Sequence, residues 1–333
     1  MDKFGFVVHP RQIEDFYGYN KVLKLIPQLI LEQCIKLIPP FKVSEVKGVR
    51  SVTGKEIGGF IIGCPLLPIQ ILNLDTNVVL KKIIGAGKIT ENLGGKIVGL
   101  GGYTSVVGDK GCRIAENLKI GVTTGSAYTA WLALEGINRG AEARGLDVSK
   151  TTVAIIGATG AIGALCAKRL CREVAKIIIT ARHMEKLEKL KEAVSKINPV
   201  EVIIELDAHK AIQNADIAIT TTSAPEALLD INEFKNGAVV CDISIPKNVN
   251  GELKGEGKVV KLIKGGLAKL PSDVDFGISI GLPKGLVYGC IAETMLLTFE
   301  GRFEDYSLGD NIDPAKLDEI AAIAKRHGFE VAL

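Results

Sequence analysis

The chain has 333 residues, of which 47% are hydrophobic and 24% are charged, and its formal net charge is +3. This length predicts two or three domains with buried cores, and the near-neutral charge without a long basic block argues against nucleic-acid binding. The seven cysteines lack paired CxxC spacing and the four histidines are scattered, so we expect reduced thiols in a cytoplasmic protein and no metal site. No apolar stretch approaches the length of a membrane-spanning helix.

The first 150 residues predict a mixed α/β region. Residues 22–39 predict an amphipathic core helix broken at Pro27, and a surface that meets acyl chains or a membrane is the alternative. Residues 43–63 predict a β-hairpin that turns at Thr53 and Gly54. Further expected elements are a helix over 76–93, a strand within 96–105 that runs into a glycine-rich loop, a strand near 119–122 and a helix over 129–144.

A glycine-rich turn follows the predicted strand 152–156 and precedes a predicted helix over 161–172. Such a turn places free backbone N–H groups and the positive end of a helix dipole beside a pyrophosphate, so it predicts dinucleotide binding. A purely structural turn is the alternative. The residues expected to contact the dinucleotide here are Gly157, Thr159, Gly160, Ala161, Ile162 and Gly163.

The end of the next predicted strand, 176–180, indicates which dinucleotide binds. A carboxylate that accepts the ribose 2′-hydroxyl is typical of NAD sites, but Thr180, Ala181 and Arg182 stand here instead. A guanidinium pairs with a 2′-phosphate, so we predict NADPH rather than NADH. The alternative is that Arg182 is a solvated loop charge.

Strands and helices alternate from residue 151 to residue 243, which predicts a Rossmann-like doubly wound parallel sheet. We also expect a helix near 226–233 and a mostly helical tail whose best helices are 287–300 and 314–326. Two strand ends are expected near the coenzyme, the segment 240–248 and the residues Thr221, Thr222 and Ser223, with ordinary turn chemistry as the alternative. The expected domains are an N-terminal α/β substrate domain, a Rossmann domain and a C-terminal helical segment, over 1–128, 129–270 and 271–333.

Cys290 is the candidate nucleophile, because it falls in the first turn of a predicted helix. A free thiol has a pKa of about 8.5, and helix N-termini lower it. Glu293 lies on the same helix face and is expected to relay protons or to stabilise the helix start. Cys64, beside Pro65, is the next candidate, whereas Cys34, Cys166 and Cys171 are expected to pack in the interior.

The chain resembles the long-chain fatty acyl-ACP reductases of cyanobacterial type, which form fatty aldehydes with NADPH. The resemblance extends over nearly the whole length in motifs of the same order. These motifs are 99–105, 123–129, 157–163, 180–182, 245–248, 255–257, 265–266, 290–301 and 326–329. Three places depart from the family pattern, namely the Ser244–Ile245 pair before Pro246, the Ser126–Ala127 pair and the glycine-rich stretch 276–286.

The resemblance implies that Cys290 carries the acyl group as a thioester, which NADPH then reduces. It implies an acyl carrier protein or CoA as the partner that delivers the acyl group, and leaves a peripheral membrane contact and a homo-oligomer open. The acyl chain is expected near Gly101, Gly102, Tyr103, Thr104, Ser105, Thr123, Thr124 and Gly125.

Two alternative functions remain at this point. Segments 221–225 and 242–246 also resemble shikimate dehydrogenases and glutamyl-tRNA reductases, which favours an NADP oxidoreductase acting on a small polar substrate. Such an enzyme needs a Lys–Asp acid–base pair, for which Lys96 and Asp109 are the nearest options. A non-catalytic NADPH-binding protein that sequesters acyl chains is the other alternative.

Overall fold

The computed structural model describes residues 1–18, 21–222, 229–244, 247–253 and 257–332. The chain forms two compact units. Unit 1 comprises Met1–Gly125, Leu270–Gly309 and Ile323–Glu330, and unit 2 comprises Ser126–Lys269, Asp310–Ala322 and Val331–Leu333. The expected boundaries after residues 128 and 270 lie close to two of these changes, whereas the expected C-terminal segment is divided between the units.

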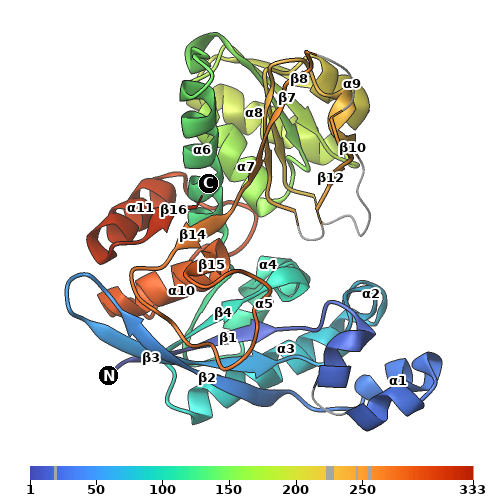
Figure 1. The fold of residues 1–333 in the computed structure, drawn as a ribbon, viewed down its shortest axis with the longest axis vertical. Helices are drawn as coiled ribbons and strands as arrows, with labels where there is room; N and C mark the ends of the chain where they lie inside the picture. The colour runs from blue at the N-terminus through green and yellow to red at the C-terminus, as the bar shows by residue number, and fades with distance from the viewer. Residues whose placement is uncertain (19–20, 223–228, 245–246, 254–256, 333) are drawn as a thin grey trace. The chain divides into compact units, whose positions relative to one another are not determined.

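Unit 1 is built on a five-stranded sheet of order β2-β3-β1-β4-β5, in which β2 is antiparallel to β3 and the other pairings are parallel (Figure 1). The predicted hairpin is confirmed as β2 and β3. Strand β1, which the sequence patterns did not predict, occupies the middle of this sheet. The strands are β1 (Lys3–Val8), β2 (Phe41–Arg50), β3 (Glu56–Gly63), β4 (Ile97–Leu100) and β5 (Gly121–Thr123).

Two helices cover opposite faces of this sheet, α3 (Thr76–Asn92) and α10 (Gly289–Glu300). A Cβ atom at Gly5 would lie 2.0 Å from the hydroxyl of Thr90, so the absent side chain lets α3 approach β1. The next residue, Phe6, points to the other face because side chains alternate along a strand. On that face, Gly99 of β4 lies beside Phe6. A Cβ atom at Gly99 would lie 2.1 Å from the hydroxyl of Thr294, so the absent side chain lets α10 approach β4.

The segment 22–39, expected as an amphipathic helix broken at Pro27, forms two short helical pieces on either side of this proline. The helix after Pro27 buries Leu31 and Ile35 but leaves Leu29 78% exposed. None of the helices in the described ranges has the length and apolar character needed to cross a bilayer. The remaining elements of unit 1 are η1 (Ile13–Gly18), η2 (Lys21–Leu25), α1 (Gln28–Ile35), α2 (Pro68–Asn73), η3 (Gly102–Ser105), α4 (Val107–Lys110), α5 (Cys112–Ala115) and β15 (Leu286–Tyr288).

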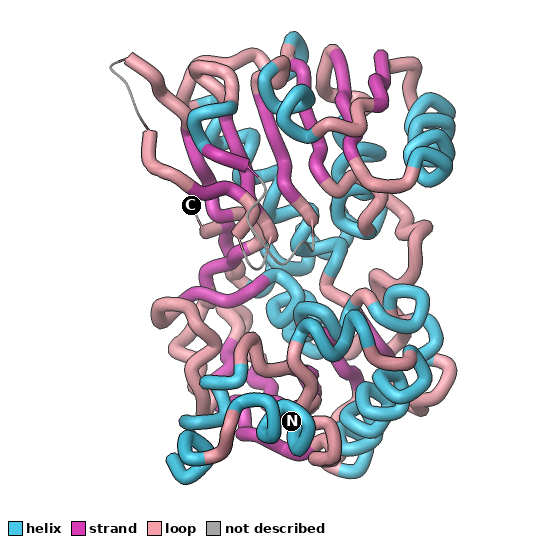
Figure 2. The backbone as a smooth tube through the Cα atoms, turned by 90° about the vertical axis from the view of Figure 1, so that its right-hand side faces the viewer, coloured by secondary structure: helices cyan, strands magenta, loops and turns pink. Residues whose placement is uncertain are grey.

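Unit 2 contains a six-stranded parallel sheet of order β13-β11-β9-β6-β7-β8, whose strands are visible in Figure 2. The strand order reverses between β6 and β9, which is the switch point at which doubly wound sheets bind ligands. The predicted α/β fold class is therefore confirmed. These strands are β6 (Thr152–Ile156), β7 (Lys176–Thr180), β8 (Glu201–Ile204), β9 (Ile217–Thr220), β11 (Val239–Asp242) and β13 (Lys261–Lys264).

Both faces of this sheet are buried. Val153 and Ile155 pack with residues of α6, α7 and α8, whereas Ala154 and Ile156 pack with residues of α9 on the other face. Alternate residues of β6 thus enter separate cores, as expected of a strand covered on both sides. The helices are α6 (Ser126–Glu142), α7 (Ala161–Leu170), α8 (Met184–Ile197) and α9 (Ala208–Gln213), with α11 (Ala315–His327) running from unit 2 into unit 1.

Two further expectations need correction. The helix expected near 226–233 is not found in its described residues 229–233, which form a short strand and a 3-10 turn, while residues 226–228 lie outside the described part of the chain. The tail is less helical than expected, because short strands alternate there with loops. The elements not yet named are η4 (Val148–Lys150), β10 (Leu229–Asp230), η5 (Ile231–Glu233), β12 (Val249–Asn250), β14 (Leu267–Lys269) and β16 (Glu330–Val331).

Candidate functional site

The carboxyl ends of four parallel strands, β3, β1, β4 and β5, lie at one edge of the unit 1 sheet. Ligands of α/β sheets bind beyond this kind of edge. The loops at 101–105 and 123–125 begin at the ends of β4 and β5. The eight residues expected to line an acyl chain are therefore brought to the same edge.

His9, just beyond β1, fixes the first of these loops. Its Nε2 atom accepts a hydrogen bond from the backbone N–H of Tyr103 at 3.0 Å, and its Nδ1–H donates to the carbonyl of Pro10 at 2.9 Å. Both ring nitrogens are thus engaged and the ring is neutral. Burial lowers the pKa of His9 below its ordinary value of 6.5, which reinforces that state. His9 holds the loop and has no free lone pair with which to act as a base.

The second loop is fixed by its two threonine side chains. The hydroxyl of Thr123 donates to the Glu293 carboxylate at 2.5 Å and accepts the backbone N–H of Gly125 at 3.2 Å. The hydroxyl of Thr124 donates to the carbonyl of Ser307 at 2.5 Å. These bonds attach the loop to α10 on one side and to the segment after α10 on the other.

Three residues with strained backbone conformations belong to segments near the 123–125 loop. Among the described residues, the non-glycine residues with positive φ are Asp109, Lys110 and Ser307, at 54°, 52° and 54°. Lys110 accepts a hydrogen bond from the backbone of Gly309, and Ser307 accepts one from Thr124. Such conformations cost about 1–3 kcal/mol each and cluster at functional sites. Their position favours this edge as the working site of unit 1.

Cys290 is the second residue of α10 and is partly exposed. The 123–125 loop packs directly on it, because a Cβ atom at Gly125 would lie 2.1 Å from the Cα atom of Cys290. The helix start has no side-chain cap, and the backbone N–H groups of Cys290 and Ile291 interact with the sulfur. Cys290 thus lies at the same edge as both glycine-rich loops.

The expectation that the helix start lowers the pKa of Cys290 is wrong. Burial, with a smaller contribution from the negative charge of Glu293, raises the pKa of this thiol to about 12. The backbone N–H groups of Cys290 and Ile291 act in the opposite direction, but they do not compensate for the loss of water. The resting nucleophile is therefore the neutral thiol.

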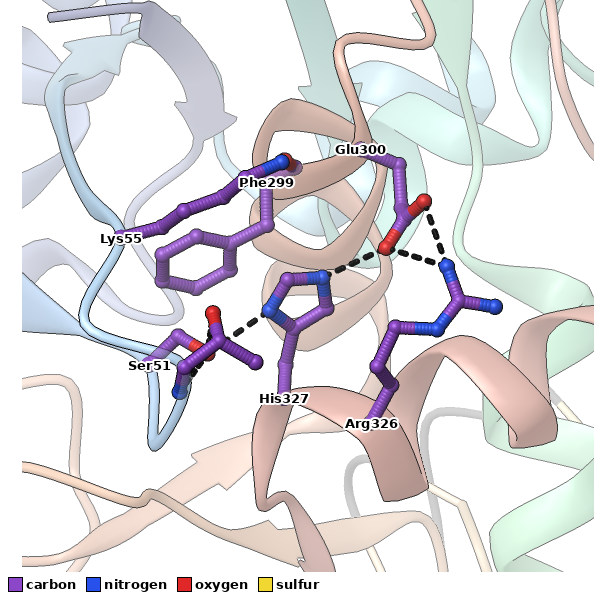
Figure 3. Close-up of polar contacts among 7 residues, drawn as sticks. Ser51, Lys55, Phe299, Glu300, Arg326 and His327 are labelled. Atoms are coloured by element: carbon purple, nitrogen blue, oxygen red, sulfur yellow. Dashed lines mark hydrogen bonds and ion pairs between the residues drawn. The ribbon is translucent and has the colours of Figure 1, made fainter.

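The far end of α10 is held by the polar cluster of Figure 3. The carboxylate of Glu300 accepts a hydrogen bond from Nε2–H of His327 at 2.7 Å and from Nη1 of Arg326 at 2.8 Å. On the other side of the ring, Nδ1 of His327 forms a hydrogen bond of 2.7 Å with the hydroxyl of Ser51. The ring of Phe299 stacks on the imidazole at a centroid distance of 4.8 Å. The cluster connects α10 to the β2–β3 hairpin and to α11.

The glycine turn of unit 2 lies at the switch point of its sheet. Gly157 has a φ of 82°, and a Cβ atom at Gly163 would lie 2.7 Å from the carbonyl of Gly157. Gly160 precedes α7 and gives it no side-chain cap, which leaves the first N–H groups of the helix free to bind an anion. This cradle fits the pyrophosphate of a dinucleotide. Thr159, Ala161 and Ile162 lie in the same turn.

The end of β7 lies on one side of this turn. The hydroxyl of Thr180 is buried and, within the described ranges, has no hydrogen-bond partner, so a ribose or phosphate oxygen fits there. Arg182 is exposed just beyond Ala181. On the other side, the hydroxyl of Thr221 donates to the carbonyl of Gly157 at 3.1 Å. The residues present thus fit a nicotinamide dinucleotide, while Ser223 lies outside the described residues.

The other cysteines offer weaker candidates. Burial raises the pKa of Cys64 to about 12, and Cys166 and Cys171 are buried in the unit 2 core. Cys34 is exposed, so the expectation that it packs in the interior is wrong, because α1 turns that face to solvent. The nearest expected acid–base lysine, Lys96, forms an ion pair of 2.8 Å with Asp2.

Comparison with known proteins agrees with this arrangement. Residues 140–262 match the family described as shikimate / quinate 5-dehydrogenase. Over 309 residues the chain is 30% identical to the long-chain acyl-[acyl-carrier-protein] reductase of Synechococcus elongatus, covering 88% of this chain and 87% of that protein. The chain belongs to the long-chain acyl-[acyl-carrier-protein] reductase family. This member of the family is therefore an enzyme, an oxidoreductase with a nicotinamide coenzyme.

Two other proteins are similar to this reductase-family chain. Aminotransferase PigE of a Serratia species is 25% identical over 345 residues, which span 99% of this chain but 39% of that protein. The solved structure of L-tryptophan dehydrogenase from Nostoc punctiforme covers 98% of this chain and 80% of that chain at 13% identity, with a TM-score of 0.39. Neither likeness bears on the substrate.

Some residues of these sites give no signal in the sequence. His9 is one of four scattered histidines, and nothing in its neighbours shows that Tyr103 hydrogen-bonds to it. Ser307 enters through its backbone carbonyl, which sequence patterns do not reveal. The pair Arg326 and His327 does fall in a motif of the family resemblance, and that motif is the signal that could have found the cluster at the end of α10.

Proposed function

We propose that the protein reduces a fatty acyl thioester to the fatty aldehyde with NADPH, through an acyl group carried on Cys290. The observation that carries this proposal is the position of Cys290 at the start of α10, packed against the 123–125 loop. Membership of the reductase family supports a thioester substrate. The name of the Synechococcus relative favours acyl carrier protein as the carrier, with CoA as the alternative that the experiment below separates.

The first half-reaction transfers the acyl group to the enzyme. The Cys290 sulfur attacks the thioester carbonyl carbon, a C–S bond to the enzyme forms, and the C–S bond to the carrier breaks. The carrier leaves as its thiol and takes the proton that Cys290 gives up. We assign the oxyanion to backbone N–H groups at the start of α10, which has no side-chain cap.

The second half-reaction releases the aldehyde. NADPH, when bound, supplies the hydride that the thioester carbon accepts. The C–S bond to Cys290 then breaks, the aldehyde leaves, and the sulfur regains its proton from solvent. The sum consumes a thioester, NADPH and a proton, and yields the aldehyde, the free carrier thiol and NADP⁺. Every electron in the product C–H bond comes from the hydride, so no other reductant is needed.

Glu293 has a positioning role in this proposal rather than a proton-relay role. Its side chain is fully buried and its carboxylate accepts the hydroxyl of Thr123. A carboxylate held in this way orients the loop that packs on Cys290. Its negative charge also opposes early ionisation of the thiol, which favours loss of the thiol proton only when the thioester is in place.

NADPH is favoured over NADH by the residues after β7. Thr180 offers a buried hydroxyl and Arg182 is exposed. The residue between them is Ala181, so none of these three residues is the carboxylate that is typical of NAD sites. A guanidinium pairs with a 2′-phosphate and has no comparable partner on NADH. We assign coenzyme contacts to Gly157, Thr159, Gly160, Ala161, Ile162, Gly163, Thr180, Ala181, Arg182, Thr221 and Thr222.

Intact-protein mass spectrometry tests the proposal directly. The protein is incubated with palmitoyl-acyl carrier protein or palmitoyl-CoA without NADPH, and we expect a gain of one palmitoyl group on the peptide that contains Cys290. Cys290→Ala is expected to lose both the label and aldehyde formation while still binding NADPH. Cys34→Ala, at an exposed thiol, is the matched control and is expected to keep both.

Two outcomes contradict the proposal. A Cys290→Ala variant that forms aldehyde at the rate of the unsubstituted protein excludes the acyl-enzyme. Reduction of 3-dehydroshikimate with no turnover of either thioester supports the small-substrate alternative, for which the match of residues 140–262 is the specific observation.

A further inference from the structure

The turn after β11 is organised by one buried carboxylate. Asp242 is 8% exposed, and its Oδ1 atom accepts the hydroxyl of Thr220 at 2.6 Å and the backbone N–H of Ser244 at 3.0 Å. Its Oδ2 atom accepts the backbone N–H groups of Asn248 at 2.9 Å and Val249 at 3.1 Å. The carboxylate thus gathers both ends of the turn and brings Ser244 and Asn248 to the end of one strand.

These two side chains carry polar atoms that the protein leaves unsatisfied. Ser244 is 8% exposed and Asn248 is 0% exposed. Within the described part of the chain, the Ser244 hydroxyl and the Asn248 Oδ1 atom have no hydrogen-bond partner. Buried polar groups are almost always paired, so an unpaired one at the carboxyl edge of a parallel sheet is a place where a bound ligand can supply the missing partner.

Contacts within unit 2 connect this pair to the glycine turn. The Asn248 Nδ2 atom donates to the carbonyl of Thr222 at 3.4 Å. The backbone nitrogen of Thr222 in turn lies 3.0 Å from the place of a Cβ atom on Gly157. Thr222 therefore lies between Asn248 and the glycine turn, at the carboxyl edge of β9 and β11.

The order of the strands decides which half of a dinucleotide reaches them. Arg182 follows β7, on one side of β6, so the 2′-phosphate and adenosine lie on that side under the proposed function. A dinucleotide spans the switch point with its pyrophosphate at the glycine turn, so its nicotinamide half extends to the other side. That side is β9 and then β11, whose end carries Ser244 and Asn248.

We propose that Asn248 and Ser244 bind the nicotinamide end of the coenzyme. The carboxamide of nicotinamide offers an NH2 donor and a carbonyl acceptor. Asn248 Oδ1 accepts from the former and the Ser244 hydroxyl donates to the latter, so each unsatisfied atom gains a partner of the right kind. This inference rests on the proposed NADPH-binding role of unit 2, but it does not depend on what Cys290 does.

A pair of nucleotides tests the proposal without turnover. Binding of NADPH is compared with binding of 2′-phospho-ADP-ribose, which has the adenosine and phosphates but no nicotinamide, by isothermal titration calorimetry. We expect Asn248→Ala and Ser244→Ala each to weaken NADPH binding by about tenfold, as the loss of one hydrogen bond predicts. Binding of the truncated nucleotide is expected to change less than about twofold.

Arg182→Ala is the matched control, because it is expected to weaken both nucleotides alike. Equal weakening of both nucleotides by Asn248→Ala and Ser244→Ala, or no weakening of either, overturns the assignment. Circular dichroism separates a folding defect in Asn248→Ala from a binding defect, and Ser244→Ala, which removes a single atom, decides the matter if the first variant unfolds. NADPH binding that follows this pattern without acylation of Cys290 rejects the proposed function and keeps this inference.

Discussion

Gly125 lies directly against Cys290, so that a Cβ atom at position 125 would stand 2.1 Å from the Cα atom of Cys290 and 2.4 Å from its Cβ atom. Real Cβ atoms do not approach their neighbours within 3.0 Å, so any side chain at this position displaces the start of α10. The 123–125 loop can lie this close to α10 only because Gly125 has no Cβ atom. A substitution at Gly125 is therefore the first test of the site.

Gly125→Ala is expected to lower the rate of Cys290 acylation by about 100-fold, because a displacement of about 1 Å costs that much in a positioned reaction. Stopped-flow mass spectrometry of acyl transfer measures it. Gly94→Ala is the control, since Gly94 has a similar φ of 78° but nothing within 4 Å of its absent Cβ atom. Acylation of Gly125→Ala at the rate of the control would show that the contact does not position the thiol.

The pKa of Cys290 near 12 predicts how the free enzyme reacts with iodoacetamide. The thiolate is the reactive form, and it is scarce well below the pKa. The alkylation rate of the Cys290 peptide is therefore expected to rise about tenfold per pH unit from pH 7 to pH 9.5. Cys290→Ser confirms the assignment of the peptide. A plateau between pH 7 and pH 8 would mean that the helix start outweighs burial.

Thr123→Val keeps the shape of the side chain but removes the hydrogen bond to the buried Glu293 carboxylate. We expect the free energy of unfolding to fall by about 1–3 kcal/mol, the usual cost of removing a donor from a buried charged group. Urea denaturation measures this loss. Thr123→Ser retains the hydroxyl and is expected to stay within about 0.5 kcal/mol of the unsubstituted protein. Equal stability of the Val and Ser variants would show that the hydrogen bond between Thr123 and Glu293 does not hold the 123–125 loop.

Glu300 predicts a pH-dependent contribution to stability. Burial acts to raise the pKa of its carboxyl, but the hydrogen bond from His327 and the charge of Arg326 prevail and hold it below the ordinary value of 4.5. A lowered carboxyl pKa stabilises the fold above pH 4.5, and that contribution disappears as the pH falls through the folded-state pKa. Glu300→Gln is therefore expected to be less stable than the unsubstituted protein at pH 7, by about 1–3 kcal/mol.

The stability difference should shrink toward zero as the pH falls from 7 to well below 4.5, the ordinary pKa of the carboxyl, as measured by urea denaturation across that range. Glu56→Gln is the control, because Glu56 pairs with Arg50 at 3.2 Å on the exposed surface, where such pairs contribute about 0–1 kcal/mol. A Glu300→Gln difference that is the same at both ends of the pH range would contradict the role given to this carboxylate.

Local patterns predicted unit 2 well because its signals are contiguous in sequence. The strand that ends at Ile156, the glycine turn and the helix that follows occupy neighbouring positions, and the parallel sheet follows from the regular alternation of strands and helices. Strand β1 escaped prediction for the opposite reason. It is buried on both faces, so it shows no alternation, and a short apolar run does not distinguish a strand from a helix.

The candidate site of unit 1 was only partly predictable. Cys290 and the two glycine-rich loops stood out, but the contact of Cys290 with Gly125 joins distant parts of the chain. The direction of the Cys290 pKa shift was mispredicted because the helix start is a local feature, whereas burial depends on the whole fold. The unpartnered atoms of Ser244 and Asn248 likewise became visible only once the surrounding side chains were placed.

The discontinuity of unit 1 also sets the order in which the chain is completed during synthesis. Residues up to Gly125 leave the ribosome early, but Leu270–Gly309, with the thiol-bearing helix, follows only after the whole of Ser126–Lys269. The residues that hold the far end of that helix, Arg326 and His327, emerge later than the helix itself. A nascent chain therefore carries all six strands of the coenzyme sheet before its thiol-bearing helix has been made, and Asp310–Ala322 of unit 2 follows only after that helix.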